Sequence, residues 1–260
     1  MEKENLVIYH GKCSDGFGAA YSAWKQLGDS ADYVPMTYDD IEDLPNIKNR
    51  NVYILDFSFD RDIYDNILNN AKSVNLLDHH KTAYDKLCGC KGCFFDLNRS
   101  GAMIAWQYFN PKLEIPTFIR YIQDGDLWKF KYPETKPFYS AITSYPHNFK
   151  EWEKLEDDKY LTSFIEKGQL LLENFNAQVL ELSKNAKEIE LLGYKGLMCN
   201  APSEFTSQLG NVLAKQCNSF ALIWQERSNN VKCGLRSVDS FDCSVIAEHF
   251  GGGGHPLSHY

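Results

Sequence analysis

The sequence predicts an α/β protein in which a doubly wound, parallel-sheet domain is joined by a helical linker to a smaller α/β domain. Short apolar runs rich in β-branched and aromatic residues alternate with helical patterns over the first half of the chain, which is typical of βαβ units. The runs 6–9, 52–55 and 74–77 indicate buried parallel strands. Helical patterns over 17–27 and 62–71 separate them, as a parallel sheet requires.

A change of texture after Trp128 indicates the end of this sheet-forming region. Residues typical of turns come first, and a long polar helical pattern follows from about 148 to 187. We interpret that pattern as a linker between two domains. The predicted boundaries are therefore 1–147 for the first domain, 148–187 for the linker and 188–260 for the second domain.

Strand and helix patterns alternate again in the second domain. The expected elements are a strand near 197–199, a helix over 203–217, strands over 220–224 and 231–235, and a helix over 243–250. Four glycines, 251–254, follow directly. Such a run lets backbone N–H groups approach an oxyanion closely, although a flexible tail would have the same composition.

Composition and charge exclude several classes of protein. With 260 residues, 43% hydrophobic and 24% charged, the chain can bury a large core and is not disordered. A net charge of −8 disfavours binding to long duplex nucleic acid. No apolar run approaches the roughly 20 residues that span a bilayer, and the acidic start is unlike a signal peptide. We expect a cytoplasmic protein, without membrane contact, whose eight cysteines are reduced.

Polar residues follow the predicted strands of the first domain. His10 ends the first run, Asp56 ends the next, and Asp78-His79-His80 ends the last. The carboxyl ends of parallel strands meet at one edge of a sheet, where ligands bind. One such residue alone is more often a turn former or helix cap. Several acids at one edge are costly without a cation, and oxygen ligands with one or two imidazoles suit Mn²⁺ or Mg²⁺ better than structural zinc.

The chain resembles the DHH phosphoesterases that carry a C-terminal DHH-associated substrate-binding domain. That family includes nanoRNases, RecJ-type exonucleases and cyclic dinucleotide phosphodiesterases. The resemblance covers nearly the whole chain and rests on six motifs in the expected order, at 9–17, 54–56, 77–81, 122–128, 235–237 and 251–255. Asp-His-His by itself would be weak evidence, but the six motifs together are specific.

The resemblance implies a pair of Mn²⁺ ions, with Mg²⁺ as the alternative, and a water between them as the nucleophile. Asp56 would bridge the two ions. His10 would share the first ion with Asp56, and the second ion would be held by Asp15, Asp56, His79 and Asp124. Spacing leaves open whether Asp124 or Asp126 is the fourth-motif ligand, and we favour Asp124.

Two further roles in the catalytic motif follow from the resemblance. Asp78 is expected to orient the His79 ring, and His80 is expected to face the phosphate and neutralise the charge that builds up on it. Cys13 stands where many members of the family have an aspartate. A thiolate ligand there would favour Zn or Fe at the first site, whereas an unligated thiol would leave that ion to His10 and Asp56.

In the second domain, the resemblance assigns substrate binding to two motifs. Arg236 presents a planar fork of donors suited to a phosphate, although a surface ion pair is the alternative. The expected substrate-binding residues of this domain are Arg236, Ser237, Gly252, Gly253, Gly254 and His255. They would hold the far end of the substrate while the first domain cleaves it.

Three other features allow a functional and a structural interpretation. Arg99 and Ser100 could bind a phosphate at a helix N-terminus, or Ser100 could simply be an N-cap. The segment with Cys88, Cys90 and Cys93 could bind zinc, but no fourth ligand is nearby, and reduced surface thiols are favoured. Among the many aromatic residues, Trp128 and Tyr145 are candidates for base stacking.

The predicted function is that of a metal-dependent exonuclease that hydrolyses very short oligonucleotides to nucleoside monophosphates. The first alternative is a phosphodiesterase for cyclic or linear dinucleotides. The second is a catalytically weak, nucleotide-binding regulatory protein. Short oligonucleotides or dinucleotides are the expected partners, and a homodimer is left open.

Overall fold

The computed structural model describes residues 2–37, 43–228, 230–252, 254–255 and 258–259. It divides into two compact units, Met1–Leu172 and Glu173–Tyr260. The boundary falls within the longest helix, α8 (Asp158–Ser183). Within the described residues, no helix combines the length and the apolar character that a membrane span requires.

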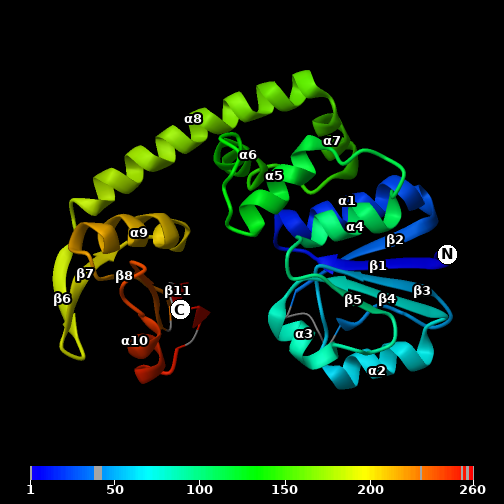
Figure 1. Ribbon diagram of the computed structural model, residues 1–260, viewed down its shortest axis with the longest axis horizontal. Helices are drawn as coiled ribbons and strands as arrows, with labels where there is room; N and C mark the ends of the chain where they lie inside the picture. Colours follow the sequence, from blue (N-terminus) through cyan, green and yellow to red (C-terminus); the bar gives the residue numbers. More distant parts are fainter. Residues whose placement is uncertain (1, 38–42, 229, 253, 256–257, 260) are drawn as a thin grey trace. The chain divides into compact units, whose positions relative to one another are not determined.

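The first unit is built on a five-stranded sheet in which every neighbouring pair is parallel (Figure 1). This confirms the doubly wound parallel sheet. In spatial order the strands are β2 (Ala31–Met36), β1 (Asn5–His10), β3 (Asn51–Leu55), β4 (Ser73–Asp78) and β5 (Cys93–Phe95). The three central strands are mostly buried, as their predominantly apolar runs predict. The edge strand β2, which the sequence patterns did not locate, is mostly half-buried.

Helices cover both faces of this sheet (Figure 1). On one face lie α1 (Ser14–Leu27) and α4 (Gly101–Phe109), and on the other lie α2 (Arg61–Asn70) and α3 (Lys81–Leu87). Both faces carry a separate apolar core. The remaining helices of this unit are α5 (Thr117–Asp126), α6 (Thr135–Ile142) and α7 (Phe149–Glu153).

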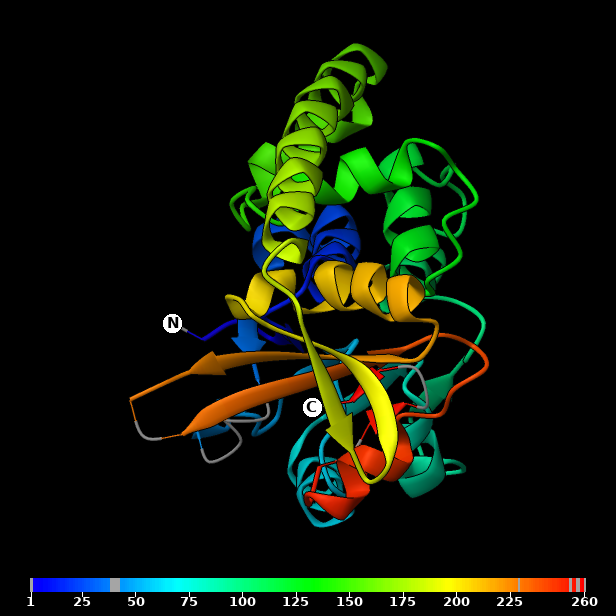
Figure 2. The same cartoon turned by 90° about the vertical axis from the view of Figure 1, so that its left-hand side faces the viewer.

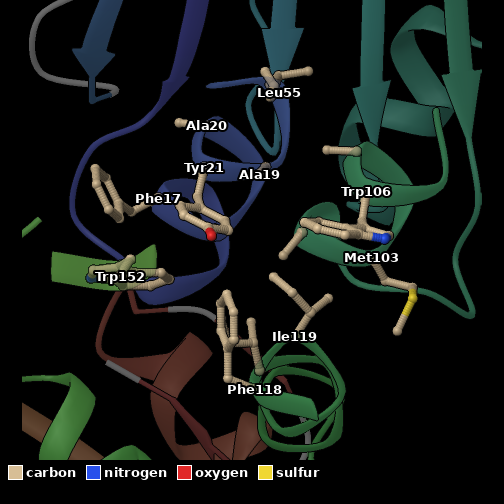
Figure 3. Packing of buried hydrophobic residues seen from close by; sticks show 14 of the residues in the cluster. Phe17, Ala19, Ala20, Tyr21, Leu55, Met103, Trp106, Phe118, Ile119 and Trp152 are labelled. Carbon is tan, nitrogen blue, oxygen red and sulfur yellow. The ribbon is translucent and has the colours of Figure 1, made fainter. Parts of the chain in front are cut away.

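A dense aromatic core fixes the helices that later prove to carry the site. Tyr21 of α1 packs between Trp106 of α4 and Phe118 of α5, and Trp152 of α7 closes the cluster (Figure 3). All four rings are at most 2% exposed. Because such interiors are as closely packed as organic crystals, the starts of α1 and α4 and the course of α5 are held rigidly.

The second unit is a mixed sheet with helices against both faces. Its strands are β6 (Lys187–Leu191), β7 (Tyr194–Asn200), β8 (Phe220–Glu226) and β9 (Val231–Ser237), followed by the two-residue strands β10 (Gly254–His255) and β11 (Ser258–His259). Only the β7–β8 pairing is parallel among those described. Helix α9 (Thr206–Cys217) covers one face and α10 (Ser244–His249) lies at the other (Figure 2). Each face has its own small apolar core, and the end of α8 shares the apolar core of α9.

Candidate metal centre

The carboxyl edge of the first sheet gathers residues from three neighbouring strands. The register of β1 with β3, and of β3 with β4, makes His10, Asp56 and Asp78 level with one another at this edge. Three groups of side chains there have ligand atoms within 4.8 Å of one another and could hold a metal ion. The groups are His10–Cys13–Asp56, Asp15–His79–Asp126 and Asp56–Asp78–His79–His80.

Asp56 occupies the centre of this edge in an unusual backbone conformation. Its φ of 52° lies in the left-handed region, which Asp and Asn tolerate better than other residues with a side chain. Its side chain is 2% exposed, and Oδ1 accepts no hydrogen bond from any described residue. A Cβ atom at Gly101 would lie 2.5 Å from the Asp56 Cβ, so only glycine fits there. Burial, reinforced by the Asp15 carboxylate, raises the pKa of Asp56 well above its ordinary value.

The first group combines a thiol with an imidazole and a carboxylate. Cys13 Sγ lies 3.0 Å from His10 Nδ1 and 3.4 Å from Asp56 Oδ2. The same sulfur caps α1, because the backbone N–H of Gly16 donates to it at 3.2 Å. Burial and the nearby Asp56 carboxylate strongly raise the pKa of the Cys13 thiol. In the metal-free protein the thiol is therefore neutral, and only a bound cation would deprotonate it.

The His79 ring lies among three carboxylates, those of Asp15 and Asp126 in the second group and that of Asp56. His79 Nε2 lies 3.2 Å from Asp56 Oδ1, 3.6 Å from Asp15 Oδ2 and 3.5 Å from Asp126 Oδ2. Partial burial and the Asp15 carboxylate raise the pKa of Asp126 to about 7. Three acids around one imidazole repel one another, and a divalent cation would relieve that repulsion.

The N-terminus of α4 binds the Asp15 carboxylate. Gly101 N–H donates to Asp15 Oδ2 at 2.6 Å, and Ala102 N–H donates to Oδ1 at 3.0 Å. Ser100 caps the same helix by accepting from the Met103 N–H, and it is fully buried. The sequence made this helix end a candidate site for a substrate phosphate, but the anion bound there is the protein's own carboxylate.

Arg99, the other residue expected to bind a phosphate there, has partners within the chain. Its Nε donates to Asp96 Oδ2 at 2.7 Å, and its Nη1 donates to Gln107 Oε1. Its guanidinium also lies over the Phe94 ring, 5.6 Å from the centroid. These contacts hold Arg99 against the loop between β5 and α4.

The structure separates the two aspartates of the fourth motif. Asp124 accepts hydrogen bonds from the N–H groups of Lys131 and Tyr132 and from the Thr135 hydroxyl, the last at 2.6 Å. These bonds outweigh burial and lower its pKa. Asp126 lies in the group with His79, and Asp124 lies in none of the groups found among the described residues. Residues two positions apart on a helix point in directions about 200° apart, so only one of Asp124 and Asp126 can face the carboxyl edge of the sheet.

Asp78 is tied to His80 rather than to the His79 ring. His80 Nδ1 lies 2.7 Å from Asp78 Oδ1, and the Ser58 hydroxyl donates to Oδ2 at 2.5 Å. His79 contacts this carboxylate only through its backbone N–H, at 2.7 Å. The hydrogen bond to Asp78 raises the pKa of His80. Burial alone would raise the pKa of Asp78, but the bond and charge of His80, with the Ser58 hydroxyl and the His79 N–H, together lower it. The pairing therefore favours the charged forms of both groups, an imidazolium and a carboxylate.

These observations fit a pair of divalent cations. The buried Oδ1 of Asp56 has no donor in the described chain, although buried carboxylate oxygens are normally paired. The two oxygens of Asp56 face different groups, since Oδ2 is close to Cys13 and Oδ1 is close to His79. The donor set is rich in oxygen and imidazole, which suits Mn²⁺ or Mg²⁺, and the single thiol marks the first group as softer than the second.

In the second unit, the Arg236 side chain is buried. It is 4% exposed, and its Nη2 donates to Ser207 Oγ at 2.8 Å while Nη1 donates to the carbonyl of Leu235 at 2.7 Å. Its aliphatic stem packs against α9, where a Cβ at Gly210 would lie 2.7 Å from Arg236 Cγ. The neighbouring Ser237 is also buried.

The glycine run follows α10. Gly252 N–H donates to the carbonyl of Ala247 at 2.8 Å, which closes the end of that helix. Gly254 and His255 form β10, which pairs with β11. Gly253 lies outside the described residues.

The remaining sequence candidates are Tyr145, the three cysteines at 88, 90 and 93, and Trp128. The hydroxyls of Tyr145 and Tyr160 are hydrogen-bonded at 2.8 Å, and the Tyr145 ring packs against the core that contains Tyr21 and Trp152. The groups able to hold a metal, as far as the chain is described, do not include Cys88, Cys90 or Cys93. Trp128, by contrast, is largely exposed.

Comparison of the sequence with known proteins finds a relative in a giant virus. An uncharacterized protein of Acanthamoeba polyphaga mimivirus is 34% identical over 282 residues, which is 98% of this chain and 66% of that protein. The chain therefore spans about two thirds of the length of its curated relative. No family model matches the sequence.

Comparison of the structure finds solved proteins of the same architecture. A pGpG-specific phosphodiesterase, PggH of Vibrio cholerae, matches with a TM-score of 0.58 and 14% identity over 99% of this chain and 92% of its own. An exopolyphosphatase-related protein of Bacteroides fragilis matches with a TM-score of 0.57 and 15% identity, over 98% of this chain and 86% of its own. RecJ of Thermus thermophilus, solved in complex with Mn²⁺, matches with a TM-score of 0.55 and 13% identity, over 98% of this chain and 49% of its own. The chain thus shares the fold of these three proteins.

Proposed function

We propose that this protein is a divalent-cation-dependent phosphodiesterase that hydrolyses very short oligonucleotides to nucleoside monophosphates. The observation that carries the proposal is Asp56, a buried carboxylate whose Oδ1 accepts no hydrogen bond from the described residues, between two groups of side chains able to hold a metal ion. The solved structures of the same fold include a phosphodiesterase and a RecJ with Mn²⁺, which supports the same interpretation.

The two cations would be held on either side of Asp56. His10 and Asp56, with Cys13 beside them, would hold the first, and Asp15, Asp56, His79 and Asp126 would hold the second. When bound, such cations activate a water for attack on phosphorus and neutralise charge on the phosphate. We assign the fourth-motif ligand to Asp126, because Asp124 already accepts three hydrogen bonds from its own loop.

His80 would supply positive charge from the protein itself. In the charged ring both nitrogens carry protons, so Nδ1 can donate to Asp78 while Nε2 donates to a phosphate oxygen. The Asp78 carboxylate favours this charged form, because its hydrogen bond raises the pKa of His80. A held imidazolium costs no reorganisation as charge grows on the phosphate.

The test is cleavage of a ladder of end-labelled oligonucleotides, from dimers upward, with Mn²⁺ present. We expect rapid release of mononucleotides from dimers to pentamers, slower cleavage of longer chains, and no cleavage with Asp56→Asn protein that is folded by circular dichroism. Tight binding of dimers without any cleavage would contradict the proposal and favour a regulatory nucleotide-binding protein.

A second candidate function is hydrolysis of dinucleotides alone, linear or cyclic. It is favoured by the similarity to PggH, which is described as specific for pGpG. Turnover of pGpG together with inert trimers and longer oligonucleotides would establish this narrower activity. Cleavage of cyclic dinucleotides would establish the cyclic variant.

A further inference from the structure

An aromatic and basic segment directly follows Asp126 and Leu127. Residues Trp128, Lys129, Phe130, Lys131 and Tyr132 alternate ring and cation without interruption. We call residues 128–132 the aromatic–lysine segment. The segment is positively charged, whereas the whole chain carries a net charge of −8. Rings interleaved with cations are the pattern by which proteins bind single-stranded nucleic acid, through base stacking and attraction of the phosphates.

The segment presents its first ring to solvent. Trp128 is 68% exposed, the largest exposed fraction among the big apolar side chains described. Its φ of 56° lies in the left-handed region, which is rare for a residue with a bulky side chain. The turn is held by hydrogen bonds from Trp128 N–H to the Gly125 carbonyl, and from Lys129 and Phe130 N–H to the Asp124 carbonyl. The backbone is therefore fixed in a shape that leaves Trp128 uncovered within the first unit.

The Trp128 ring is also supported from one side. The Phe130 ring lies against it edge to face, with centroids 4.9 Å apart and planes inclined at 73°. Lys136 Nζ lies 5.2 Å from the centroid of the Phe130 ring. An indole braced by a second ring loses little rotamer freedom when a flat ligand stacks on it.

The position of Trp128 sets what could stack there. Two peptide units separate it from Asp126, so the two Cα atoms are at most about 7.6 Å apart. A phosphate bound at the cations would carry its base one sugar away. We propose that Trp128, supported by Phe130, is the platform on which a nucleobase of the substrate stacks, with Lys129 adding attraction for the sugar-phosphate chain. The inference rests on the proposed function and names a binding site for it within the first unit.

The experiment compares two ligands that differ only in the base. Binding of AMP and of ribose 5-phosphate is measured by calorimetry with Mg²⁺ present, for wild type, Trp128→Ala and Trp128→Phe. We expect Trp128→Ala to weaken AMP binding at least about tenfold and to leave ribose 5-phosphate binding unchanged, because stacking acts on the base alone. Trp128→Phe should retain most of the affinity for AMP. The matched control is Tyr108→Ala, which removes another half-exposed ring at the far end of α4.

Each outcome bears on one claim. Equal losses for both ligands, or none in Trp128→Ala, would overturn the platform. If AMP binding depends on Trp128 but no oligonucleotide is cleaved, the platform stands and the proposed hydrolysis fails. If both Trp128 variants bind AMP and cleave oligonucleotides as wild type does, the proposed hydrolysis stands and the platform fails.

Discussion

The two units use buried charge in opposite ways. In the first unit, Asp56 is buried beside other acids and one of its oxygens accepts no hydrogen bond from the described residues. In the second unit, the equally buried Arg236 donates to Ser207 and to the Leu235 carbonyl. A buried charge whose donors are taken up within the chain is compatible with a structural role, whereas a buried charge among like charges is costly unless something from outside the chain compensates it. Burial alone does not distinguish the two, and the partners do.

The largest effect should come from removing the central charge of the first unit. Asp56→Asn should lower the rate of oligonucleotide hydrolysis by about 10³-fold or more, because both cations lose a shared ligand. The metal-free variant should be at least as stable as wild type, since Asn tolerates the left-handed backbone and no longer buries a charge. Rates and urea unfolding measure the two effects. A stability loss with normal turnover would reverse the roles assigned to the two regions.

Removing the charge of the second unit should do the opposite. Arg236→Ala should lower the free energy of unfolding by about 2–4 kcal/mol, because it leaves buried acceptors unpaired and opens space against α9. Arg236→Lys should recover part of that loss. Denaturant unfolding measures the change. An unaltered stability together with a raised KM for oligonucleotides would show that Arg236 serves the substrate first, as the sequence predicted.

A smaller effect should separate the neighbouring acids of α5. Asp126→Asn should weaken Mn²⁺ binding about tenfold or more with little change in melting temperature, because its carboxylate faces the cluster. Asp124→Asn should instead lower stability by about 1–2 kcal/mol, since it weakens three hydrogen bonds to the following loop. Calorimetric titration and thermal melts provide the two readouts. Interchanged results would restore Asp124 as the ligand.

The smallest effect should be a pH dependence of stabilisation by metal. Asp56 and Asp126 have raised pKa values in the metal-free fold, the latter about 7. Each contributes stability below its unfolded pKa near 4, and that contribution is lost as pH rises through the folded pKa. The gain in melting temperature on adding Mn²⁺ should therefore be larger at about pH 8 than at about pH 6, by about 2–4 °C. Asp126→Asn should reduce the difference, and an equal gain at both values would contradict it.

Much of the fold follows from local sequence. The strands β1, β3 and β4 coincide with short, predominantly apolar runs, so the sequence could locate them. The half-buried β2 and the mostly exposed β6 carry no such run, so periodicity could not locate them. Their strand conformation comes from pairing with β1 and β7, which is a tertiary effect.

The site divides along the same line. His10, Asp56 and His79 could be predicted because a parallel sheet gathers its strand ends wherever the helices lie. The choice between Asp124 and Asp126 depends on the rotation of α5, which is set by packing in the aromatic core. The ligand of the α4 N-terminus could not be found locally, because Asp15 lies 86 residues before Gly101 in sequence.

Asp15 and Asp126, the two carboxylates of the second group, differ in how firmly the chain holds them. Both of its oxygens are anchored by backbone N–H groups, so this carboxylate cannot turn to follow a cation. Asp126 sits at the last position of α5, with a side chain that is 26% exposed. Any shift of a bound cation during turnover would therefore be followed by the Asp126 carboxylate, while the Asp15 carboxylate stayed fixed.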